Sequence, residues 1–85
     1  MSETIQTWPA THRVVELDVR DDLRAGREPF SRIRDTVAGL RDDDVLQLRA
    51  TFEPVPLFAV LDAHGFVHAA KAYARDDWSV WFWRP

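Results

Sequence analysis

The sequence contains no cysteine, only three glycines and a single lysine, Lys71, among its 85 residues. Without thiols, the chain cannot form a disulfide, a thiolate nucleophile, a cysteine-ligated zinc site or an iron–sulfur cluster of its own. Three widely spaced glycines also exclude a Gly-rich phosphate loop. Stability must therefore come from packing, for which the sequence supplies 46% hydrophobic and 12% aromatic residues.

Long apolar runs are missing as well. The longest, Val55–Ala63, is interrupted by Pro56 and Asp62 and is too short to span a bilayer. Residues 1–11 are polar and show neither the basic start nor the apolar stretch of a secretory signal. We therefore expect a cytoplasmic protein with no membrane partner. Its length predicts one domain over residues 12–85, preceded by a flexible arm.

The charge balance argues against a nucleic-acid partner. The net charge is −3, acidic and basic residues are mixed along the chain, and no basic block is present. Weak binding of single strands stays open as an alternative, because exposed aromatic rings could stack on bases. All cations except Lys71 are arginines, whose forked guanidinium groups suit carboxylate or phosphate partners.

Hydrophobic periodicity predicts four strands and two helices. Alternation predicts a strand over residues 13–19, and helical spacing predicts a helix from Pro29 that Gly39 ends. An apolar strand, a second helix and two further strands follow at residues 45–52, 57–64, 66–74 and 78–83, and residues 20–28 are expected to be a charged loop. The order β-α-β-α-β-β predicts an α/β two-layer sandwich (α+β), with two helices on one face of a four-stranded mixed sheet and its other face open.

Several segments resemble the family called domain of unknown function 2249. The resemblance rests on Leu17-Asp18-Val19-Arg20, on the charged loop to Pro29, on the turn Glu53-Pro54-Val55-Pro56-Leu57 and on the terminal Val80-Trp81 strand. It covers Val14 to Arg84 and implies a TusA-like fold, because the family is related in fold to the TusA/SirA-like sulfur carriers.

Two departures limit what the resemblance implies for function. The sulfur carriers hold a Cys-Pro-x-Pro signature at the start of their first helix, and with Pro29 on its second proline, Gly26 stands where the cysteine would be. Sulfur relay through a protein thiol is therefore unavailable. Many relatives also read Asp-His-Asp-Pro-x-Pro-Leu at the second turn, whereas this chain has no histidine within residues 50–57, which weakens a metal hypothesis there.

The two predicted strand-to-helix turns are the first candidate site, because ligands favour the carboxyl ends of strands in open α/β layers. A small anionic ligand could be held by the arginines of the first turn, with the second turn alongside; the candidate residues are Arg20, Arg24, Arg27, Glu53, Pro54 and Pro56. The alternative is that the acidic residues complement helix dipoles and the arginines pair with Asp21 and Asp22.

Metal and catalytic sites find little support in the residues. His64 and His68 are four apart, but Gly65 between them places the second histidine on a strand, so we predict no metal and no cofactor. Ser31 and Ser79 lack a nucleophile-elbow context. We therefore expect a protein that is not an enzyme.

The aromatic last strand is the second candidate site. Alternation sends Trp81 and Trp83 to one face and Val80 and Phe82 to the other. Guided by the family's tryptophan, we predict that the tryptophans meet the helices, so that Val80 and Phe82 form an exposed interface. Either the arm with Trp8 covers this face, or the chain forms a homodimer through this face or through a terminal edge strand.

Taken together, the residues predict a non-catalytic small binding or protein-interaction module, with an unknown protein partner or a small anionic ligand. The alternative from another class is an accessory protein of redox, sulfur or metal-cofactor metabolism, which rests on analogy of fold alone.

Overall fold

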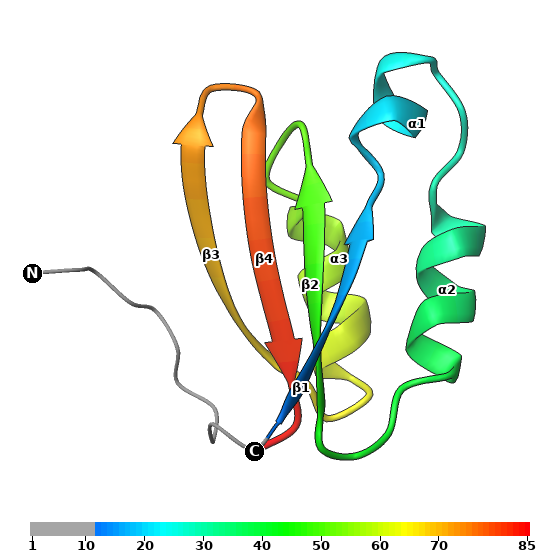
Figure 1. Cartoon of the computed structure of the whole chain (residues 1–85), viewed down its shortest axis with the longest axis vertical. Helices are drawn as coiled ribbons and strands as arrows, with labels where there is room; N and C mark the ends of the chain where they lie inside the picture. The colour runs from blue at the N-terminus through cyan, green and yellow to red at the C-terminus, as the bar shows by residue number, and fades with distance from the viewer. Residues whose placement is uncertain (1–11) are drawn as a thin grey trace, which may run out of the picture.

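The computed structural model of this protein describes residues 12–85, so the predicted arm and Trp8 lie outside the described residues. Seven elements follow one another along this part of the chain (Figure 1). They are β1 (Arg13–Asp18), α1 (Arg20–Arg24), α2 (Phe30–Ala38), β2 (Asp44–Ala50), α3 (Val55–Asp62), β3 (Val67–Ala74) and β4 (Asp77–Trp83).

The strands form one mixed sheet in the order β1-β2-β4-β3. β1 and β2 are parallel and are connected through α1 and α2, whereas β4 runs antiparallel to both β2 and β3. β2 is therefore an interior strand, as its nearly continuous apolar sequence predicts. The mixed four-stranded sheet and the order of the predicted strands are confirmed.

The main core lies between the sheet and the helices α2 and α3. Ile33 of α2 and Leu57 and Leu61 of α3 are buried against residues that share one face of the sheet. The strand residues of this face are Leu17, Leu46, Leu48, Ala50, Val80 and Phe82. The predicted two-layer arrangement, with both longer helices on one face, is confirmed (Figure 1).

The predicted faces of the last strand are wrong. Val80 and Phe82 point toward the helices and are 0% and 1% exposed, so neither is available as an interface. Trp81 and Trp83 lie on the opposite face, where they form a second buried cluster with Val45. Both faces of this strand are equally apolar in sequence, and alternation shows which residues share a face but not which face meets the helices.

The predicted charged loop after β1 contains a third helix, α1, which the sequence prediction missed. A carboxylate oxygen of Asp18 accepts a hydrogen bond from the backbone N–H of Arg20 at 3.0 Å, and Asp21 and Asp22 lie in the first helical turn, where acidic side chains are favourable. Gly26, with φ of +73°, takes the chain out of this turn toward α2. α1 is short and charged, so it has no apolar period for the sequence to reveal.

Candidate functional site

The two strand-to-helix turns come together, as predicted, but the pocket between them is apolar. It has a volume of about 210 Å³. Pro54 and Pro56 from the second turn line it, facing Phe30 from the start of α2. Phe30 and Phe52 at its rim are about half exposed. Pro54 and Pro56 therefore lie where the sequence places them, in a pocket whose walls suit apolar rather than anionic groups.

The three candidate arginines do not line this pocket. Each forms an ion pair with a carboxylate: Arg20 with Asp18 at 2.7 Å and Asp77 at 3.2 Å, Arg24 with Asp21 at 3.4 Å, and Arg27 with Asp22 at 2.9 Å. The hydrogen bond from Arg20 lowers the pKa of Asp18 to about 2, and those from Arg27 and Arg32 lower the pKa of Asp22. The arrangement matches the alternative in which these arginines hold the loop rather than an anion.

Of the two acidic residues in these turns, Glu28 has a local structural role and Glu53 has none. Glu28 accepts hydrogen bonds from the backbone N–H of Phe30 and, at 3.1 Å, from the hydroxyl of Ser31, so a carboxylate already occupies the N-terminus of α2. Glu53 is exposed and does not line the pocket. The structure therefore gives these residues no shared ligand site.

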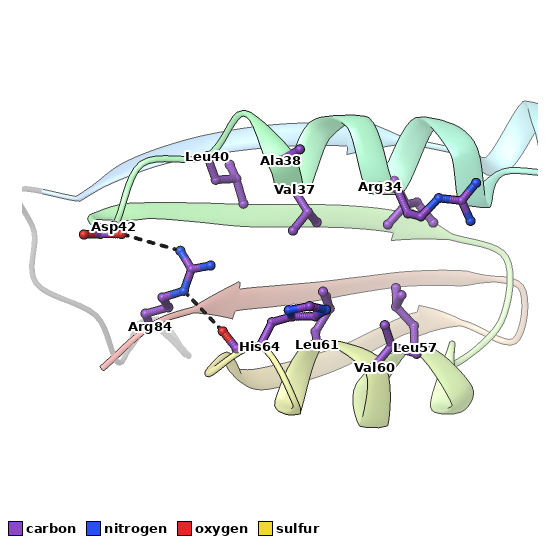
Figure 2. Close-up of a pocket in the computed structure, with 11 residues that line it drawn as sticks. Arg34, Val37, Ala38, Leu40, Asp42, Leu57, Val60, Leu61, His64 and Arg84 are labelled. Atoms are coloured by element: carbon purple, nitrogen blue, oxygen red, sulfur yellow. Dashed lines mark hydrogen bonds and ion pairs between the residues drawn. The ribbon is translucent and has the colours of Figure 1, made fainter.

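A larger cavity, which the sequence did not predict, runs between α2 and α3 (Figure 2). Its volume is about 510 Å³, within the range of about 300–1,000 Å³ that is usual for ligand pockets. We call it the α2–α3 groove. Val37 and Leu40 project into it from the α2 side, and Leu57, Val60 and Leu61 from α3. Ile33 and Leu57 also line the smaller pocket, so the two cavities adjoin.

One end of the α2–α3 groove is polar. Arg84, directly after β4, lies there between Asp42 and His64 (Figure 2). Its guanidinium lies 4.2 Å from the centre of the Phe66 ring, its Nε donates to the backbone oxygen of His64 at 3.4 Å, and its Nη1 is 3.7 Å from an oxygen of Asp42. A cation therefore stands at one end of a cavity whose middle is lined by apolar side chains.

The two histidines do not form a metal site together. His64 lines the α2–α3 groove, whereas His68 lies on β3 and stacks on Phe58 with ring centres 3.9 Å apart. Within residues 12–85, no three histidine, aspartate or glutamate side chains converge as metal ligands. His68 thus lies on a strand, as predicted.

Sequence reasoning missed the α2–α3 groove, although α3 carries a signal for it. Five consecutive residues of this helix, Leu57 to Leu61, are apolar, so the helix offers more apolar surface than one face of a sheet can cover. Val60 is 55% exposed as a result. No feature of the sequence indicates that Arg84 lines the groove, because its position depends on where the end of β4 meets the turn after α3.

The fold and the groove together define a small α+β domain with a ligand-sized apolar cavity between two helices that cover one face of a mixed sheet. Residues 16–84 match the family model described as "Uncharacterized conserved protein (DUF2249)", and the chain belongs to that family. Searches of curated proteins and of solved structures return no match. In residues 12–85, no helix is long and apolar enough to cross a membrane.

Proposed function

We propose that this protein is a non-catalytic binding module that takes an elongated apolar small molecule into the α2–α3 groove. One observation carries the proposal: apolar side chains of two helices face each other across a cavity of about 510 Å³ that no side chain of residues 12–85 fills. The groove leaves apolar side chains such as Val60 exposed, and a contiguous exposed apolar surface of ligand size usually marks a binding site.

The dimensions of the groove favour a linear ligand. α2 has 9 residues, which at about 1.5 Å per residue gives a wall about 13 Å long. The facing wall is the similarly long α3, with Val60 in its second half. An alkyl chain lying between the helices would remove Val37, Leu40 and Val60 from water, and burial of apolar area supplies the binding free energy.

The test is a titration of the full chain with 1-octanol, followed by amide chemical shifts in NMR spectra. We expect the shifts to concentrate in α2 and α3. Val60→Gln should weaken binding about fivefold to tenfold, because a buried amide replaces an apolar contact. Val55→Gln is the matched control: Val55 lies on the same helix, is also 55% exposed and does not line the groove, so its affinity should equal that of the native chain.

Two results would overturn the proposal. The first is saturable binding that Val60→Gln and Val55→Gln weaken equally, since the groove would then not be the site. The second is a dimer in sedimentation that dissociates on Val60→Gln, since the groove would then be an interface between copies. Homodimerisation, a relation to redox, sulfur or metal-cofactor metabolism and a TusA-like relationship of the fold stay predictions of the sequence.

A further inference from the structure

We infer that the ligand of the α2–α3 groove is an amphipathic carboxylate, an alkyl chain with an acidic head group that Arg84 binds. This inference rests on the proposed function and adds the chemical class and the orientation of the ligand. It places the alkyl chain between α2 and α3 and the head group at the end of the groove near the turn after α3 (Figure 2).

Arg84 is held in place before any ligand arrives. Its guanidinium stacks at 4.2 Å from the centre of the Phe66 ring, and its Nε donates to the backbone oxygen of His64 at 3.4 Å. Two contacts that use one face and one edge of the group leave its terminal nitrogens for another acceptor. A guanidinium with a fixed plane loses less entropy when it binds a carboxylate in a forked geometry.

The partner that Arg84 has in the structure is weak. The distance from Nη1 to Asp42 is 3.7 Å, beyond hydrogen-bond length, and the Asp42 side chain is fully exposed, whereas that of Arg84 is 35% exposed. Exposed ion pairs of this kind contribute little free energy. A ligand carboxylate at the groove end can therefore replace Asp42 at small cost and form shorter, charge-assisted hydrogen bonds.

The other cation of the groove does not compete for this role. Arg34 lines the opposite end, where its Nη2 donates to the hydroxyl of Ser31 on its own helix at 3.4 Å, and Figure 2 shows its guanidinium directed away from Arg84. The directions of the two guanidinium groups therefore assign the head group to the Arg84 end of the groove.

The experiment compares octanoate with 1-octanol, which share the alkyl chain and differ in the head group. For the native chain, we expect octanoate to bind about tenfold more tightly than 1-octanol. Arg84→Gln should reduce this ratio to about one. Asp42→Asn should raise the octanoate affinity about twofold to threefold, because it removes the competing carboxylate without altering Arg84. Arg41→Gln, an equal charge change at an exposed residue outside the groove, should leave the ratio unchanged.

The outcomes separate this inference from the proposed function. If 1-octanol binds in the groove but octanoate binds no more tightly, the carboxylate inference is overturned and the proposed function stands. If neither probe binds, both fail. Loss of the octanoate preference in Arg34→Gln, with retention in Arg84→Gln, would reverse the orientation and overturn the inference. Arg84→Lys, which keeps the charge but not the fork, should keep part of the preference and shows whether the folded groove survives the substitution.

Discussion

Asp44, the first residue of β2, accepts two hydrogen bonds from the guanidinium of Arg13, the first residue of the neighbouring β1, at 3.2 and 2.7 Å. The two residues are directly opposite in the parallel register. The Asp44 side chain is 2% exposed, and it also accepts the backbone N–H of Arg41 at 2.9 Å. One buried carboxylate thus joins the edge strand to the interior strand and closes the turn that leads into it.

Loss of this carboxylate should destabilise the fold. Asp44→Asn removes the charge and one of the two acceptor oxygens, so at least one of the three donors supplied by Arg13 and Arg41 loses its partner. We expect Tm to fall by roughly 5–10 °C in thermal unfolding followed by circular dichroism. Asp43→Asn is the control, because Asp43 is exposed and adjacent. Equal effects of the two substitutions would contradict the role of the buried Asp44 carboxylate.

Stability should also decline in acid. The hydrogen bond from Arg20 lowers the pKa of Asp18 to about 2, and that from Arg13 lowers the pKa of Asp44. Because the unfolded chain titrates near pH 4, these groups contribute their full stability above about pH 4 and lose it as the pH falls toward their folded pKa values. We expect the free energy of unfolding, measured with urea, to drop between pH 4 and pH 2.

Asp18→Asn should reduce the fall of the free energy of unfolding between pH 4 and pH 2. The reduction should be modest, because the Asp18 side chain is 44% exposed and solvent screens its pair with Arg20. Parallel pH curves for the native chain and this variant would show that Asp18 does not contribute.

The sequence predicted those parts of the fold that depend on local periodicity. Leu17 and Val19 share a buried face, as alternation requires, and Ile33 and Val37 of α2 and Leu40 just after it recur at helical spacing on the side that faces the core. These patterns are specific because one face of each element is apolar and the other is polar. The resemblance to the family is confirmed by the family model that matches residues 16–84.

The candidate site could be predicted only in part, because it depends on distances between elements. Pro54 and Pro56 line the smaller pocket because turns after adjacent parallel strands meet at one edge of the sheet, but a ligand there stays a prediction. The gap between α2 and α3 follows from how far apart two helices pack, which no spacing in the sequence encodes. The position of Arg84 follows from the same tertiary arrangement.

Because the Phe82 side chain of β4 points toward the helices, its truncation should strongly destabilise the fold. Phe82 is 1% exposed and contacts the helix layer, so Phe82→Ala should cost about 3–5 kcal/mol of unfolding free energy. Phe52→Ala removes the same side chain from a residue that is 51% exposed, and it should cost less than about 1 kcal/mol. The comparison is made by urea unfolding at pH 7. A small effect of Phe82→Ala would restore the open-face orientation that the sequence suggested.

The backbone conformations of Gly26, in the loop between α1 and α2, and Gly39, directly after α2, predict different effects for their substitution by alanine. Gly26 has φ of +73°, a conformation that residues with a Cβ rarely adopt, and an added Cβ would meet no atom within 4 Å. Gly26→Ala should therefore cost about 1 kcal/mol through backbone strain alone. Gly39, the C-cap of α2, has φ of −91°, and an added Cβ would lie 3.7 Å from the backbone oxygen of Thr36, an ordinary contact. Gly39→Ala should leave stability unchanged or raise it by about 0.5 kcal/mol, because it restricts only the unfolded chain. Equal stabilities of the two variants in urea unfolding would contradict the positive φ at Gly26.

The loop between α1 and α2 carries Arg27, which pairs with Asp22, and it ends at Pro29, which lines the smaller pocket. Strain in Gly26→Ala should therefore shift the amide resonances around this pocket more than Gly39→Ala does.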